Sequence, residues 1–170
     1  IAAKTEGLIG QLIPEHDEFL SRVLNGVPSV STPFVSLVPL KDQNGRLRSG
    51  LPTMFSCVPV RDENFRVVAI LGMRISPERE FTEIMQRGKY GATGETYAID
   101  KTGVLISNSR FDQELILLGM IPDIQGAASI LNIQIRDPGG DMTSGFRPKV
   151  RRSELPYTKA AQAAIDGTTG

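Results

Sequence analysis

The sequence contains few of the residues from which most catalytic and metal sites are built. Its 170 residues include one cysteine, Cys57, and one histidine, His16. A single cysteine cannot form a disulfide within the chain, and one cysteine with one histidine cannot complete a four-ligand zinc site. The two residues lie on separate expected elements, without the signature of a catalytic cysteine–histidine pair. We therefore interpret Cys57 as a small buried apolar residue and expect this chain to have no enzymatic activity, metal or cofactor.

Neither sign of charge is in excess, and long apolar runs are missing. Lys and Arg together number 19, as do Asp and Glu. Nucleic-acid-binding domains carry a surplus of Lys and Arg, so we expect no nucleic-acid partner. No window approaches the roughly 20 apolar residues that a membrane-spanning helix requires. With 40% hydrophobic and 22% charged residues, the composition is typical of a folded globular protein.

Three short motifs resemble ligand sites but lack residues that such sites require. The glycine-rich segment 88–94 (GKYGATG) has no Lys-Ser/Thr ending and precedes an expected strand, which favours a turn over a phosphate-binding loop. Asp137 and Asp141 flank two glycines, but their spacing does not match an EF-hand calcium loop. The basic residues of 149–152 indicate a solvated loop, with contact to a ligand or lipid surface as the alternative.

Hydrophobic periodicity predicts one helix and three strands in the first part of the chain. Apolar residues recur at helical spacing from Glu15 to Leu24. Strands are expected over Phe34–Leu40, Thr53–Val60 and Arg66–Ile75. The third contains a near-continuous apolar run, which is typical of a central strand covered on both faces.

A helix is expected next, over Pro77–Arg87. Ser76 is a favourable capping residue, proline suits the first helical position, and Gly88 is a natural stop. The helix carries a narrow apolar stripe, from which we expect it to pack against the units on both sides.

The second part of the chain begins with a predicted hairpin. Strands at Thr96–Ile99 and Val104–Ser107 flank the sequence DKTG, in which the aspartate accepts from the local backbone and the glycine supplies positive φ. A helix, a strand and a further helix are then expected at Asp112–Leu118, Ser129–Ile135 and Thr158–Ile165.

These elements predict an α+β fold with antiparallel sheets, because helices and strands do not alternate as they do in a parallel sheet. We expect two units, residues 1–76 and 95–170, connected by the helix and turn of residues 77–94.

Two stretches of sequence carry a family resemblance. PVRDENFRVVAILGMRIS and, after the expected helix, TGETYAIDKTGVLISNS are similar to the double Cache domain of bacterial receptors. The match is closest over residues 33–110 and lies mostly in turn and core patterns. The resemblance implies a membrane-distal and a membrane-proximal PAS-like subdomain. The later segments IRDPGGDMTSG and RRSELPYTKAAQAAIDGTTG resemble the sensor regions of planctomycete-type transmembrane serine/threonine protein kinases.

The resemblance implies ligand detection and signal relay. We expect the extracytoplasmic small-molecule sensor domain of a membrane receptor, a serine/threonine protein kinase that can form a homodimer. Further strands are expected after Gly170, so that the second subdomain is incomplete, and the first is expected to be short at its front. The alternative is a ligand-free structural or dimerisation module whose cavity is filled by side chains such as Phe55 and Phe65. An enzyme that uses Cys57 is a weaker alternative.

The resemblance also indicates ligand-binding residues in the first subdomain. Amine-sensing double Cache domains carry an acid where this chain has Arg74. They usually have a tyrosine at the position of Phe34 and often a carboxylate at the position of Ser36. The reversed charge leads to the hypothesis that the first pocket binds a carboxylate or another anion through Arg74, with Arg48 as a helper. A salt bridge from Arg74 to a local Asp or Glu is the alternative.

In the second subdomain, Tyr97 is the expected ligand contact. Tyr97 and Ser107 lie on strands expected to border a cavity, and Arg110 follows them. The alternative for all three is a packing or solvent-facing role.

Overall fold

Antiparallel strand pairs and short helices make up the described part of the chain, which confirms the predicted α+β class. The computed structural model describes residues 17–42, 44–88 and 90–168. The chain divides into two units, Ile1–Ser76 and Pro77–Gly170. Within the described ranges, no helix has both the length and the apolar character needed to cross a membrane.

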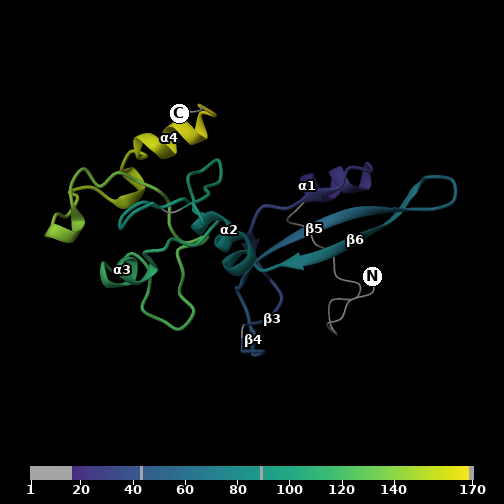
Figure 1. Cartoon of the computed structure of the whole chain (residues 1–170), viewed down its shortest axis with the longest axis horizontal. Helices are drawn as coiled ribbons and strands as arrows, with labels where there is room; N and C mark the ends of the chain where they lie inside the picture. The colour runs from purple at the N-terminus through teal and green to yellow at the C-terminus, as the bar shows by residue number, and fades with distance from the viewer. Residues whose placement is uncertain (1–16, 43, 89, 169–170) are drawn as a thin grey trace. The chain divides into compact units, whose positions relative to one another are not determined.

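The first unit contains a helix and several strands (Figure 1), whose bounds are α1 Asp17–Leu24, β1 Ser29–Val30, β2 Phe34–Val35, β3 Leu40–Lys41, β4 Leu47–Arg48, β5 Pro52–Arg61 and β6 Val67–Ile75. Helix α1 falls within the predicted segment, of which Glu15 and His16 lie outside the described residues. Val23 is fully buried where α1 packs against β1, β5 and β6. Gly26, just past the helix, has a φ of 90°, the left-handed conformation common at helix ends.

Strand β5 is the centre of the first sheet. β6 pairs with one edge of β5 along most of its length, whereas β1 and β2 pair with separate parts of the other edge. β3 and β4 form a ribbon of their own, and every pairing is antiparallel. The turn between β5 and β6 is closed by Asp62, whose Oδ1 accepts the N–H groups of Asn64 and Arg66 at 2.9 Å.

The prediction that the third strand is central and covered on both faces is wrong. Among the described residues β6 pairs with β5 alone and is an edge strand, whereas β5, with β1 and β2 on its other edge, is central. Leu71 and Met73 share one face and are 64% and 65% exposed, and Val58 and Val60 on β5 are exposed on the same face. On the opposite face Cys57 is buried. The hairpin therefore has one face that is partly covered, on the side of β5, and one open apolar face.

The predicted strand Phe34–Leu40 is instead two short strands. The Ser36 N–H still donates to the Leu51 carbonyl at 2.9 Å, but the Ser36 hydroxyl donates to the carbonyl of Val38 at 2.8 Å. Local side-chain-to-backbone bonds of this kind compete with a regular ladder. Beyond the turn, β3 pairs with β4 rather than with β5.

The second unit begins with the expected helix, but its first turn is wider than predicted. Pro77–Phe81 (η2) forms a π-helical turn, and Thr82–Gln86 (α2) continues as an α-helix. The buried Thr82 hydroxyl donates to the Pro77 carbonyl at 2.9 Å and accepts the N–H of Asn108 at 3.0 Å. These bonds tie α2 to the segment that follows the hairpin of the same unit.

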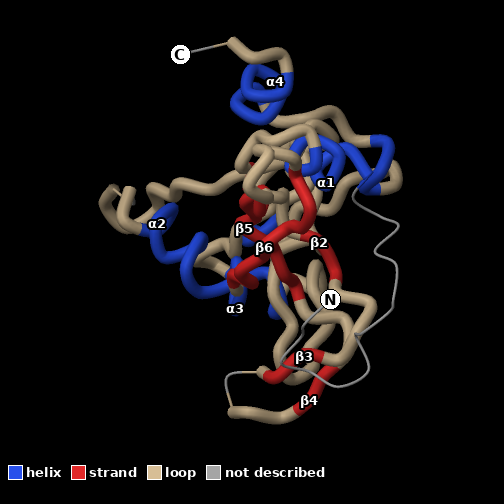
Figure 2. Tube along the Cα trace, turned by 90° about the vertical axis from the view of Figure 1, so that its right-hand side faces the viewer, coloured by secondary structure: helices blue, strands red, loops and turns tan. Residues whose placement is uncertain are grey.

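The remaining helical elements are separated by long irregular segments, drawn as tan tube in Figure 2, and have the bounds α3 Asp112–Leu117, η3 Met142–Ser144, η4 Arg152–Glu154 and α4 Lys159–Ile165. Both α3 and α4 lie where the sequence predicted helices. Thr158 caps α4, since its Oγ1 accepts the N–H of Ala161 at 3.2 Å. Leu105, Ile121 and Ile133 form a buried core cluster of this unit.

The predicted turn at Asp100–Gly103 is confirmed. The Gly103 N–H donates to the Asp100 carbonyl at 3.0 Å, and the Asp100 carboxylate accepts the N–H groups of Thr102 and Val104 at 2.8 and 3.0 Å. The arms of this hairpin meet in a single bridge between Ile99 and Leu105 rather than in regular strands.

The segment Ser129–Ile135 lies beside this hairpin but is not the strand that was predicted. Val104 and Gln134 form a single antiparallel bridge. Leu131 has a φ of 60°, and a left-handed residue interrupts the extended backbone that a continuous ladder needs. The described part of the second unit therefore has isolated bridges where a sheet was expected.

Candidate functional site

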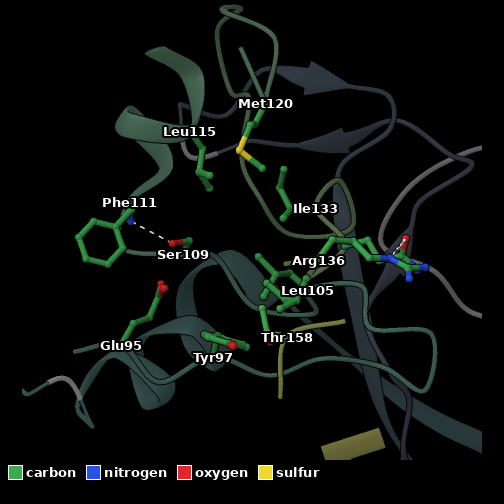
Figure 3. A pocket seen from close by; sticks show the side chains of 12 residues that line it. Glu95, Tyr97, Leu105, Ser109, Phe111, Leu115, Met120, Ile133, Arg136 and Thr158 are labelled. Carbon is green, nitrogen blue, oxygen red and sulfur yellow. Dashed lines mark hydrogen bonds between the residues drawn. The ribbon is translucent and has the colours of Figure 1, made fainter. Parts of the chain in front are cut away.

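A half-open cavity of about 260 Å³ lies in the second unit (Figure 3). Its walls come from the hairpin, from the segment that crosses it, from α3 and its flanks, and from the cap of α4. The lining residues are Glu95, Tyr97, Leu105, Ser109, Phe111, Leu115, Met120, Ile133, Gln134, Ile135, Arg136 and Thr158. Half of these side chains are aliphatic, Met or Phe, and such a lining suits the apolar body of a small molecule.

Glu95, Tyr97 and Ser109 place polar groups on one side of the cavity. In Figure 3 the Glu95 carboxylate points toward Ser109. Glu95 Oε1 accepts the N–H of Arg110 at 2.7 Å, and the Ser109 Oγ accepts the N–H of Phe111 at 3.1 Å. These backbone bonds hold the carboxylate and the hydroxyl in place, and Ser109 is buried.

The guanidinium groups of Arg136, which lines the cavity, and of Arg110 are bound to other groups. Arg136 lines the cavity with its stem, while its guanidinium points away from Glu95 (Figure 3). This guanidinium donates to the carbonyl of Leu155 at 2.8 Å and lies 3.9 Å from the centroid of the Tyr157 ring. Arg110 donates to the carbonyl of Gly94 at 2.9 Å.

Burial and negative charge act on the titratable groups at this site. Burial raises the pKa of Tyr97, the Glu95 carboxylate raises it further, and the hydrogen bond to the Thr158 side chain lowers it. Burial likewise raises the pKa of Asp112, against hydrogen bonds from Ser129 that lower it, and Glu95 adds to the rise. Glu95 therefore acts as a negative charge on both neighbouring groups.

The other residues that the sequence indicated in this unit support the cavity. Ser107 is fully buried and does not line the cavity, because its Oγ accepts the N–H of Ala98 at 3.0 Å across the hairpin. The Arg110 guanidinium lies 5.1 Å from the centroid of the Phe111 ring. Both residues hold lining segments in position.

In the first unit, the structure brings Arg74 and Phe34 together around Thr53. Arg74 Nε donates to Thr53 Oγ1 at 3.1 Å. Phe34 lies opposite Thr53 in the β2–β5 pair, and its ring stacks on Phe55 with 6.1 Å between centroids. Thr53 is buried and Arg74 is exposed. Binding of an anion by Arg74 stays a prediction.

Ser36 and Arg48 have other surroundings. The buried Ser36 uses its hydroxyl in the backbone turn that ends β2. Arg48 lies opposite Leu40 in the separate β3–β4 ribbon, so strand pairing does not align it with Arg74. Cys57 is buried on β5, and burial raises the pKa of its thiol. His16 lies outside the described residues.

The polar loop after the hairpin is built around aspartate-capped turns. The Asp141 carboxylate accepts from the Ser144 hydroxyl at 2.6 Å and from the hydroxyl and N–H of Thr143, which lowers its pKa to about 2. Asp137 accepts the N–H of Gly139 at 2.8 Å. Burial lowers the pKa of Arg152. In the described part of the chain, no three His, Cys, Asp or Glu side chains lie close enough to hold a metal ion.

No motif in the sequence indicated Glu95 or Ser109 as a site residue. Glu95 is two residues before Tyr97, and Ser109 is two residues after Ser107. Residues two apart in an extended segment share a face, so alternation along the hairpin was the available signal. Leu115, by contrast, reaches the cavity from α3, and no local pattern indicates that contact.

Comparison with protein-family models, with curated proteins and with solved structures found no match to this chain.

Proposed function

We propose that this chain is the extracytoplasmic small-molecule sensor domain of a transmembrane signalling receptor, a serine/threonine protein kinase with a double Cache architecture. The observation that carries the proposal is the half-open cavity of the second unit, with an apolar lining and a polar side formed by Glu95, Tyr97 and Ser109. The resemblance of the hairpin and the preceding segments supplies the receptor context.

The proposed mechanism is a shift between conformations. A small molecule that binds one arrangement of the cavity walls better than another stabilises that arrangement. The shift cannot exceed the ligand's preference between the two states. Because Thr158 both lines the cavity and caps α4, the start of that helix is a position where occupancy changes local structure.

Calorimetry against fractionated small metabolites tests the proposal. A fraction is expected to bind the natural chain, and Leu115→Phe, which adds a ring at the cavity wall, is expected to weaken binding about tenfold or more. Leu117→Phe is the matched control, because Leu117 lies on the same helix and is 86% exposed. The proposal fails when no fraction binds, or when Leu115→Phe binds as the control does.

In the first unit, we propose that Arg74 binds a carboxylate ligand. The Thr53 hydroxyl and the stacked rings of Phe34 and Phe55 beside Arg74 support this proposal. Arg74→Ala is expected to weaken binding of a carboxylate probe, whereas Arg79→Ala, at an exposed position of η2, is the control. Unchanged carboxylate affinity in Arg74→Ala would contradict the proposal that Arg74 binds the ligand.

A second candidate function is a dimerisation module without a ligand. It is favoured by the open apolar face of the β5–β6 hairpin, formed by Val58, Val60, Leu71 and Met73. An edge strand with such a face is suited to pair with or pack on a second copy.

A further inference from the structure

We propose that the second-unit cavity binds a small organic ammonium ion with an apolar body, and that Glu95 is its counter-ion. This inference rests on the proposed sensor function and adds the chemical class of the ligand. This cavity is separate from the proposed Arg74 site. The cavity is expected to bind a cation, whereas Arg74 is expected to bind an anion.

The size and lining of the cavity set the body of the ligand. About 260 Å³ lies just below the range of about 300–1,000 Å³ typical of pockets for drug-sized molecules. Leu105, Leu115, Met120 and Ile133 contribute apolar side chains to the wall. A ligand with a single ring or a short branched chain matches this volume and lining.

The charge at the cavity selects a cation. Glu95 is the acidic side chain of the lining, and its Oε1 is fixed by the N–H of Arg110 at 2.7 Å. Arg136, the basic side chain of the lining, uses its guanidinium on Leu155 and Tyr157 instead. An anion in the cavity would therefore lie near the fixed Glu95 carboxylate. No cation of the described lining would point toward that anion.

The polar atoms around Glu95 match the donors of an ammonium group. An ammonium ion donates hydrogen bonds and accepts none. The Glu95 carboxylate and the hydroxyl oxygen of Ser109 are acceptors that lie on the same side of the cavity (Figure 3). The Ser109 Oγ accepts one hydrogen bond, from Phe111, and a hydroxyl oxygen has room for a second.

Calorimetry with three probes of similar shape tests the inference on the natural chain. The probes are phenethylammonium, phenethyl alcohol and hydrocinnamate, which share a phenyl ring on a short chain and differ in charge. The ammonium probe is expected to bind about tenfold tighter than the alcohol, because hydrogen bonds to charged groups are stronger, and the carboxylate is expected to bind weakest.

Glu95→Gln links the preference to one residue. The substitution keeps an oxygen for the Arg110 N–H but removes the charge, so ammonium affinity is expected to fall about tenfold while alcohol affinity stays unchanged. Glu114→Gln on the exposed side of α3 is the matched control. The probe series on the natural chain needs no variant, so it decides the inference even when Glu95→Gln is poorly folded.

Equal or tighter binding of the alcohol or the carboxylate would overturn the inference, as would unchanged ammonium affinity in a folded Glu95→Gln. When none of the three probes binds but a metabolite fraction does, the ammonium inference fails and the sensor proposal stands. When neither binds, both fail.

Discussion

Gly103 shows how a single residue determines the packing of the second hairpin. Its φ is 73°, and a Cβ at this position would lie 2.5 Å from Cε1 of Tyr157. Tyr157 is held by the Arg136 guanidinium over its ring and donates its hydroxyl hydrogen to the Thr102 carbonyl at 3.0 Å. The ring therefore cannot easily move away from an added side chain.

Gly103→Ala is expected to lower the free energy of unfolding by about 2 kcal/mol, from the left-handed backbone and from the contact with Tyr157. Gly119→Ala is the control, since Gly119 has a φ of 69° but a Cβ there meets nothing within 4 Å. The control is expected to cost about 1 kcal/mol. Urea unfolding measures both, and equal losses would contradict the role given to Tyr157.

Tyr97 reports the charge at the cavity. Burial is the main cause of its raised pKa and Glu95 is the second, so Glu95→Gln is expected to lower the pKa of Tyr97 without returning it to the ordinary value near 10. Titration of the isotope-labelled tyrosine Cζ resonance by nuclear magnetic resonance follows Tyr97 separately from Tyr90 and Tyr157. Glu114→Gln is expected to leave the curve unchanged. A rise of the Tyr97 pKa in Glu95→Gln would contradict the assignment of the Glu95 charge as a cause of the raised pKa.

At the scale of elements, the Asp100 turn was predictable and departures from regular strands were not. Asp100 accepts the N–H of Thr102 and is followed by Gly103, whose positive φ its residue type indicates. Asp62 forms the same kind of turn, but there the residue with positive φ is Phe65, which the sequence does not indicate. The end of β2 depends on the Ser36 hydroxyl, and the irregular segment 129–135 depends on the positive φ of Leu131. Hydrophobic periodicity in the sequence indicates neither the hydrogen bond of Ser36 nor the positive φ of Leu131. The edge position of β6 could not be predicted either, because an apolar run does not specify its neighbours.

The β5–β6 turn contains strain that a glycine would relieve. Phe65 has a φ of 61° and is 79% exposed, so its ring loses little packing on removal. Phe65→Gly is expected to raise the free energy of unfolding by about 0.5 to 1 kcal/mol, after the greater freedom of glycine in the unfolded chain is subtracted.

Glu63→Gly in the same turn is the control, because Glu63 does not have a positive φ. Among the described residues, Phe65 and Leu131 are the non-glycine residues that do. It is expected to give no gain in stability. Thermal unfolding compares the two variants, and a loss of stability in Phe65→Gly would mean that the ring has a contact that stabilises the fold.

At the scale of the whole molecule, the charges balance while one apolar face stays open. With 19 basic and 19 acidic residues, net repulsion between copies is weak. The face formed by Val58, Val60, Leu71 and Met73 then favours self-association.

Sedimentation equilibrium is expected to show a reversible dimer that Leu71→Lys with Met73→Lys weakens about tenfold or more. Gln113→Lys with Ser153→Lys adds the same charge at exposed positions of the second unit and is expected to leave association unchanged. A natural chain that stays monomeric, or a double variant that associates equally well, would argue against this face.

Thr158 belongs at once to the wall of the cavity and to the first turn of α4. Linkage makes such a shared residue work in both directions. A ligand that stabilises the capping rotamer of Thr158 therefore stabilises α4. By the same coupling, a contact that stabilises or unfolds α4 from its C-terminal end changes the affinity of the cavity for that ligand.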